Sequence, residues 1–305
     1  MKQNAVLFLL CSCALVISCG QNPTESGKTK PSFKDVIGIE FTEVRRAFDT
    51  GLSFNKYGFQ LEPEWIVNFT AEDSIKIFSP KEDRFIHYPI YYDHGAVFNF
   101  AREWFRVIKV SRDSMVFQLL QVRSKVVSKE MSNVYMTFYS ENYLKNVLHA
   151  DADSLKQPNR KDSLFIRSRA MLANQNPDSI LAARNPVVLR SKVSFIQAQK
   201  VKNSPDLING RNKSDEYLLP EYNITINKAY KDFNYSISVI VDQNGNMQFR
   251  RFLNAVMPEF EESKTRIVKA LIEGYLKPYL DIKPGSTLGF PHSSSVKLNM
   301  IGRKG

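Results

Sequence analysis

Three observations predict an α+β fold with two folded parts joined by a short helical linker. The chain has 305 residues, which is more than one average domain requires. Across residues 65–139, apolar and polar side chains alternate, as is typical of antiparallel strands. Near the C-terminus, strands flank one amphipathic helix. A hydrophobic fraction of 43% and a charged fraction of 24% exclude a wholly disordered chain.

Residues 1–18 have the features of a signal peptide. Lys2 supplies a positive charge, and residues 5–17 form an apolar stretch that is too short to span a bilayer as a helix. The stretch is followed by Ser18 and Cys19, and the segment 16–19 resembles the bacterial lipobox. The resemblance implies cleavage between Ser18 and Cys19 and attachment of fatty acyl chains such as palmitate to Cys19. The lipid would anchor the chain to one leaflet of a membrane.

The cysteine positions agree with this interpretation. All three cysteines, Cys11, Cys13 and Cys19, lie in the first nineteen residues. A lipobox at Cys13 would leave a much shorter apolar region, which favours Cys19. Cleavage before Cys19 leaves one thiol, and the lipid occupies it, so we expect no disulfide and no thiolate metal site. An ordinary secretory signal with a chance cysteine is the alternative.

Residues 19–34 are predicted to form a flexible tether, because 20–32 contain no aromatic or aliphatic side chain. Residues 35–149 are predicted to form a β-rich domain, either a small antiparallel barrel or a sheet. Its first elements are a strand at 36–41 and a short helix at 44–52, with Thr42 as a candidate N-cap.

The rest of this domain follows a period of two. Its clearest hairpin runs over 104–122 and turns at 111–114, and a last strand covers 134–138. A closing helix is expected at 140–148, with Ser140 as its N-cap. Residues 150–215 then form the predicted linker of loops and short helices.

Within the linker, helices are expected at 164–173 and 178–184, divided and ended by Asn-Pro pairs.

Residues 216–305 have a different pattern from the linker and are predicted to form the C-terminal domain. An apolar strand ends at Val241, Asp242 to Gly245 form a turn, and 247–253 return as a second strand. A helix begins at Pro258 and ends near Pro278, and a final strand follows. This order predicts one helix packed on an antiparallel sheet.

The same order resembles the C-terminal domain of TonB-like proteins over roughly 218–301. The matching segments are the strand and turn at 236–245, the Leu-Lys-Pro bend at 276–278, Gly285 or Gly289, and the last strand at 295–300. The resemblance implies a domain that pairs an exposed strand edge with an extended segment of a partner. Energy-transducing members also have a spanning helix and a proline-rich spacer, which this chain replaces with a lipobox, so energy transduction is not expected.

The sequence therefore predicts a non-enzymatic envelope lipoprotein that binds a protein partner by β-augmentation. Gly20 follows the lipidated cysteine, where Asp would favour inner-membrane retention, so the outer membrane facing the periplasm is the expected location. The expected partner-binding edge is the last strand, because its polar face would keep an exposed edge soluble. Its residues are Ser294, Ser295, Val296, Lys297, Leu298, Asn299 and Met300. A purely structural last strand is the alternative.

A second hypothesis assigns the function to the N-terminal domain as a lipocalin-like binder of a small apolar ligand. Alternating apolar side chains in this domain could line a cavity or fill a core. They are Phe98, Phe100, Trp104, Phe105, Val107, Phe117 and Leu119.

The remaining motifs favour no catalytic or metal chemistry. Nucleotide-binding, nucleophile-elbow and zinc-protease motifs are absent from the sequence. His87 and His94 lie seven residues apart, on opposite faces of a strand, and Asp151 to Asp162 lacks the glycine of a calcium loop. The net charge of +11 is dispersed along the chain, so we expect attraction to anionic headgroups or envelope polymers rather than nucleic acid binding. No metal or cofactor is expected.

Overall fold

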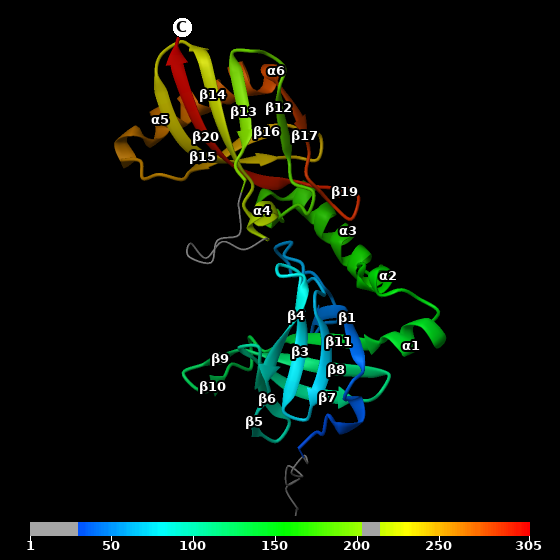
Figure 1. The fold of residues 1–305 in the computed structure, drawn as a ribbon. Helices are drawn as coiled ribbons and strands as arrows, with labels where there is room; N and C mark the ends of the chain where they lie inside the picture. Colours follow the sequence, from blue (N-terminus) through cyan, green and yellow to red (C-terminus); the bar gives the residue numbers. More distant parts are fainter. Residues whose placement is uncertain (1–29, 203–213) are drawn as a thin grey trace, which may run out of the picture.

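A computed structural model describes residues 30–202 and 214–305 as two β-rich bodies connected through a helical segment (Figure 1). The signal peptide, Ser18, Cys19 and most of the expected tether lie outside the described residues. Among the helices of the described residues, none combines the length and apolar character required to cross a bilayer. The expectations of mixed α and β structure and of a β-rich N-terminal part are confirmed.

The N-terminal body is one antiparallel sheet of nine strands, preceded by the short helix η1 (Lys34–Val36). The strands are β1 (Glu40–Phe48), β2 (Ile66–Ala71), β3 (Ser74–Ser79), β4 (Arg84–Pro89), β5 (Tyr91–His94), β6 (Val97–Phe100), β7 (Glu103–Val110), β8 (Ser114–Leu120) and β11 (Val134–Ser140). The strand order is β4-β3-β2-β1-β11-β8-β7-β6-β5, so the two edge strands are β4 and β5, which follow one another in the sequence. The sheet is therefore nearly closed. The short strands β9 (Val122–Arg123) and β10 (Val126–Val127) form a separate hairpin.

Aromatic rings fill the interior of this body. Phe100 and Phe105 stack with their ring centroids 4.3 Å apart, and Phe117 contacts both. Phe33, which precedes η1, stacks on Phe69 at 4.3 Å. Of the residues proposed to line a cavity, Phe98, Phe100, Phe105, Val107 and Phe117 are buried in this cluster, and Leu119 packs against it. Ring-on-ring packing of this kind favours a filled core over a ligand cavity.

The helix predicted at 44–52 is wrong, because residues up to Phe48 belong to β1. Glu43 is opposite Phe138 and Arg45 is opposite Thr137, so Val44 is an extra residue in a β-bulge. The bulge interrupts the alternation of buried and exposed residues, and this produced a spacing that resembles a helix. The predicted hairpin is confirmed as β7 and β8.

The connecting segment contains three helices and a 3₁₀ turn. They are α1 (Glu141–Asn146), α2 (Ala152–Lys156), α3 (Arg160–Gln175) and η2 (Pro177–Ser179). Ser140 caps α1 as expected, since its side chain accepts a hydrogen bond from the Tyr143 N–H. The helix expected at 178–184 is reduced to η2. Two strands were not expected in the linker, namely β12 (Val188–Ser191) and β13 (Ile196–Lys200).

The C-terminal body contains a five-stranded sheet in the order β13-β14-β20-β15-β16. Its remaining strands are β14 (Glu221–Ala229), β15 (Phe233–Val241), β16 (Met247–Phe252) and β20 (Ser294–Lys304). Further elements are α4 (Asp215–Leu218), α5 (Pro258–Leu271), the π-helical turn η3 (Ile272–Leu276), α6 (Lys277–Tyr279), β17 (Leu280–Lys283), β18 (Ser286–Thr287) and β19 (Phe290–Pro291). β12 pairs with β17 beside this sheet, and β18 pairs with β19. The predicted order of strand, turn, strand, helix and strand is present, but the predicted antiparallel sheet is wrong, because β14 and β20 run parallel and make the sheet mixed.

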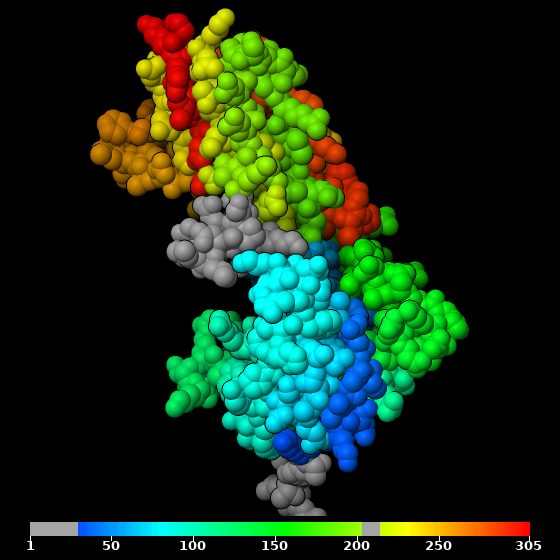
Figure 2. All heavy atoms as spheres, in the orientation of Figure 1, coloured from blue at the N-terminus to red at the C-terminus, as the bar shows by residue number. Residues whose placement is uncertain are grey.

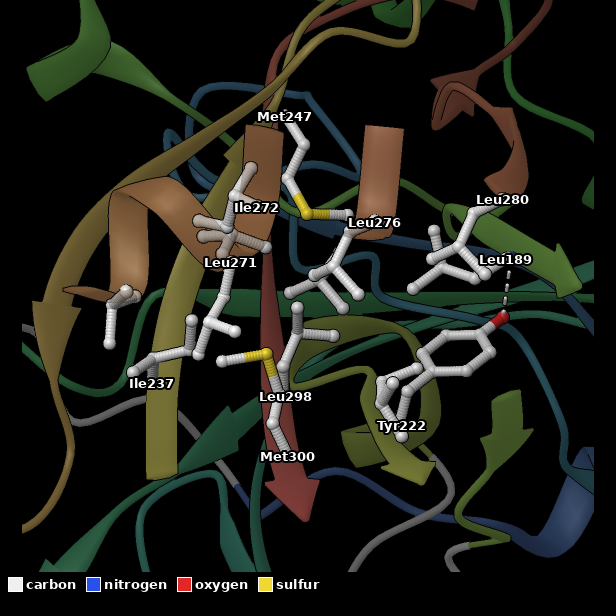
Figure 3. Packing of buried hydrophobic residues seen from close by; sticks show 14 of the residues in the cluster. Leu189, Tyr222, Ile237, Met247, Leu271, Ile272, Leu276, Leu280, Leu298 and Met300 are labelled. Atoms are coloured by element: carbon white, nitrogen blue, oxygen red, sulfur yellow. Dashed lines mark hydrogen bonds between the residues drawn. The ribbon is translucent and has the colours of Figure 1, made fainter. Parts of the chain in front are cut away.

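One face of this sheet packs on the helix. Figure 3 shows Ile272 and Leu276 of η3 above Leu298 and Met300 of β20, with Ile237 of β15 beside them. All five side chains are buried. The Tyr222 hydroxyl lies in the same cluster, where it donates to the Val187 carbonyl at 3.0 Å and accepts from the Leu189 N–H at 3.4 Å. Burial raises the pKa of Tyr222, so its hydroxyl stays a neutral hydrogen-bonding group in this core.

The last strand is not the exposed edge that the sequence suggested. β20 lies between β14 and β15, parallel to the first and antiparallel to the second. β15 pairs along the whole range from Ser294 to Met300, and β14 pairs from Lys297 onward, so no partner strand can add at Lys297 to Met300. The polar side chains of β20 lie on the face of the sheet opposite the helix. They therefore mark an exposed face of the sheet and not an exposed edge.

Candidate binding cleft

Helix α3 is attached to the N-terminal body through a buried carboxylate at its first turn. Asp162 accepts hydrogen bonds from Arg45 Nη1 at 2.7 Å, from the Ser53 N–H at 2.8 Å and from the Asn159 N–H at 3.0 Å. Burial opposes the ionisation of Asp162, but these hydrogen bonds outweigh it and hold its pKa below the usual value. An ionised Asp162 therefore connects α3 to β1 and to the loop that follows it.

The other end of α3 is attached to the C-terminal body. Asn174 Oδ1 accepts from the Ser293 N–H at 2.8 Å, and its Nδ2 donates to the Pro291 carbonyl at 3.3 Å. His292 is fully buried between these two residues. Its Nε2 lies 3.0 Å from Thr287 Oγ1 and its Nδ1 lies 3.2 Å from the Ser293 carbonyl. Burial lowers the pKa of His292, which favours a neutral ring that donates from Nδ1 and accepts at Nε2.

Two loops bring the bodies into direct contact beside α3. The Ala182 N–H donates to the Tyr57 carbonyl at 2.9 Å. Gly58 has a φ of +90° and fits closely against Ala182, whose carbonyl oxygen would lie 2.4 Å from an added Cβ. Arg184 pairs with Glu62 and lies over the Tyr217 ring, 4.2 Å from its centroid. These contacts and those of α3 fix the position of one body against the other.

A cleft of about 690 Å³ lies where these loops meet the open face of the C-terminal sheet. The residues around it come from both bodies, which adjoin one another in Figure 2. Its apolar lining includes Ile180, Leu218, Leu219, Pro220 and Leu253. Its polar lining includes Asp215, Glu221, Ser238, Arg250, Arg251, Ser295 and Lys297. Tyr57 of the N-terminal body completes the rim.

Polar side chains on the open face of the sheet are connected by hydrogen bonds. Ser238 and Ser295 share a bond of 2.8 Å between their hydroxyls. Asn299 accepts from Ser236 at 2.8 Å and donates to Glu221 at 2.6 Å. Lys297 Nζ is 3.1 Å from the same Glu221 carboxylate. The open face is therefore ordered, and its acidic group is already neutralised by a lysine.

A second β-bulge places two adjacent arginines on this open face. Val239 is opposite Phe249 and Ser238 is opposite Arg251, which leaves Arg250 as the extra residue of β16. Phe249 and Phe252 pack against the core under the helix. In a regular strand, only one residue that faces outward lies between two residues that face the core. The bulge adds a residue, so two arginines face outward between Phe249 and Phe252. Both arginines are exposed and line the cleft, and within the described residues neither forms an ion pair.

The sequence did not identify these arginines, because two basic residues near a turn are typical of solvated surface. Ser295 and Lys297, two of the expected site residues, do line the cleft, while Val296, Leu298 and Met300 are core residues. Ser294 is buried and Asn299 belongs to the hydrogen-bonded open face. Ser18 and Cys19 lie outside the described residues.

The remaining candidate residues have local structural contacts. His94 Nδ1 lies 2.6 Å from the adjacent Asp93 carboxylate, and Asp151 caps α2 by accepting from the Ser154 N–H at 2.8 Å. His87 is exposed on β4. Across 30–202 and 214–305, no three His, Cys, Asp or Glu side chains converge in a way that could hold a metal ion.

No protein-family model matches this chain, and no curated protein is significantly similar to it.

Proposed function

We propose that this chain is a lipid-anchored, non-enzymatic envelope protein whose TonB-like C-terminal body binds an extended segment of a protein partner. The proposal places the chain in the outer membrane facing the periplasm, with an acylated Cys19. Partner binding is assigned to the edge strand β16 and the adjoining cleft, and no longer to the last strand.

The position of β16 is the observation that carries this proposal. β16 ends the five-stranded sheet, and in the described part of the chain its only strand neighbour is β15. An edge strand presents backbone N–H and C=O groups that an added strand can satisfy. Gln248 is exposed on this strand, and the cleft lies beside its C-terminal half. An extended segment paired with β16 would have its side chains next to the cleft.

The lipid anchor is supported by the lipobox-like segment that ends in Ser18 and Cys19. Labelling cells with a fatty acid analogue tests it directly. The wild-type chain is expected to incorporate the label and to fractionate with membranes, while Cys19→Ser is expected to lose both properties. A Cys13→Ser variant is the matched control and should behave as the wild type. Equal labelling of the Cys19→Ser variant would contradict the lipid anchor.

Partner binding is tested by photo-cross-linking in intact cell envelopes. A photoreactive amino acid at Gln248 on β16 is expected to form a covalent adduct with one envelope protein. The same amino acid at Gln199, which is exposed on the opposite edge strand β13, provides the control. Adducts of equal yield from both positions, or none from position 248, would rule out β16 as the binding edge.

A further inference from the structure

The unpaired charge in the cleft indicates which kind of segment the cleft selects. Lys297 and Glu221 neutralise one another at 3.1 Å, and Asp215 also has an interaction partner. Arg250 and Arg251 form no ion pair within the described residues, although both line the cleft. The two guanidinium groups therefore make the β16 side of the cleft positive, and the bulge fixes them on the same face.

Next to this positive side, apolar groups line the cleft. Leu219 is 67% exposed, and Leu218, Leu253 and Ile180 lie around the same space. An exposed leucine of this kind is stabilised when a ligand covers it. A ligand that fits both kinds of lining residue has carboxylates for the arginines and apolar side chains for the leucines.

We propose that the cleft binds an acidic, extended peptide segment, in which carboxylates pair with Arg250 and Arg251 and an apolar side chain covers Leu219 and Leu253. This inference rests on the proposed function and adds the chemistry of the partner. Arginine binds a carboxylate through two parallel N–H···O bonds, and an acidic peptide can add apolar side chains to that pairing, which inorganic phosphate cannot. The adjacent edge of β16 favours an extended backbone over a helix.

Fluorescence anisotropy with a synthetic peptide tests the proposal on the full-length chain in detergent. The probe is a labelled peptide in which glutamate and valine alternate, and the comparison peptide has lysine in place of glutamate. The wild-type chain is expected to bind the acidic peptide at least about tenfold more tightly than the basic one. This preference should weaken as salt is added, because exposed charges are screened.

The decisive variant is the double substitution Arg250→Glu and Arg251→Glu. It is expected to lower the affinity for the acidic peptide by about tenfold or more. A matched control carries Lys269→Glu and Arg303→Glu, which make the same change of net charge at exposed positions outside the cleft. The control is expected to bind within about twofold of the wild type.

Three results would overturn the inference. They are equal binding of the two peptides, unchanged affinity of the Arg250 and Arg251 double variant, and an equal loss in the control. A cross-link from Gln248 to an envelope protein, with no effect of the double variant on peptide affinity, would retain the proposed function and reject the acidic specificity. If the photoreactive amino acid at position 248 gives no cross-link in cell envelopes although the protein binds the acidic peptide, β16 is rejected as the edge used in the cell.

Discussion

The sheets of the two bodies differ in whether their faces and edges are covered or left open. The N-terminal sheet is nearly closed around stacked phenylalanines, and its buried acid, Glu43, is fully hydrogen-bonded. The C-terminal sheet is open, with a helix on one face and serine, asparagine and arginine side chains on the other. A closed sheet satisfies its own groups, while an open one leaves a face and two edges available. The comparison therefore directs functional experiments to the C-terminal body and its cleft.

The largest effect is expected on the stability of the N-terminal body when its buried carboxylate, Glu43, is removed. Arg46 binds the Glu43 carboxylate through Nε at 2.7 Å and Nη2 at 2.6 Å, and the Glu64 N–H donates to it at 2.9 Å. Glu43→Gln removes the buried charge that pairs with Arg46, so we expect the free energy of unfolding to fall by about 3–5 kcal/mol. Urea unfolding followed by tryptophan fluorescence reports on this body, because both tryptophans, Trp65 and Trp104, lie in it.

Glu40→Gln is the matched control for this experiment, since Glu40 is exposed on the same strand. Its effect should stay within about 0.5 kcal/mol. Circular dichroism follows both bodies, so a fluorescence transition that moves alone would show that the bodies unfold separately. An unchanged midpoint of urea unfolding for Glu43→Gln would show that the buried ion pair does not stabilise the N-terminal body.

The next effect concerns the joint between the bodies. Asp162→Asn removes the charge that pairs with Arg45 and weakens the capping box of α3, so we expect a loss of about 2–3 kcal/mol. Because the pKa of Asp162 is lowered in the folded state, its contribution is present above the pKa of the unfolded chain. The contribution is lost as pH falls through the lower, folded-state pKa.

Acid titration of unfolding free energy measures this difference. The wild type should lose more stability than Asp162→Asn between the unfolded-state and folded-state pKa values, and the two should converge below both. Asp153→Asn, at an exposed residue of α2, is the control and should keep the wild-type pH dependence. Parallel acid curves for the wild type and Asp162→Asn would show that this carboxylate does not stabilise the joint.

Much of the local structure could be predicted from the sequence because it depends on near neighbours. The β7 and β8 hairpin follows from alternation within one short stretch. The turn after Val241 follows from Asp242, which accepts from the Asn244 N–H at 2.8 Å and the Asn246 N–H at 2.9 Å, and from Gly245 at a φ of +84°. These interactions span only a few residues.

The errors come from features that local patterns do not encode. Alternation in β20 shows which side chains share a face, but it does not say whether a neighbouring strand is present. The neighbour is β14, which is far away in the sequence and runs parallel to β20. The bulges at Val44 and Arg250 also depend on partner strands, so neither the first strand nor the arginine pair could be assigned from spacing alone.

The smallest expected effect comes from comparing the helix starts of the connecting segment with that of the C-terminal body. Ser140 and Asn159 cap α1 and α3, whereas the N-cap position of α5 is Met257, whose side chain forms no capping hydrogen bond. Met257 already has the extended backbone of an N-cap, with a ψ of 136°, and is 63% exposed. Met257→Ser should therefore stabilise the C-terminal body by about 0.5–1 kcal/mol in thermal unfolding followed by circular dichroism.

Met131→Ser is the control, because Met131 is an exposed methionine in the N-terminal body and precedes no helix. It should leave the unfolding temperature unchanged, and a similar gain from both variants would contradict the capping argument. The same Met257→Ser protein should also be tested in the cross-linking experiment. A stabilised protein that captures less partner would mean that the uncapped methionine contributes to binding, since natural chains keep such destabilising residues where function requires them. Unchanged capture would show that Met257 does not contribute to partner binding.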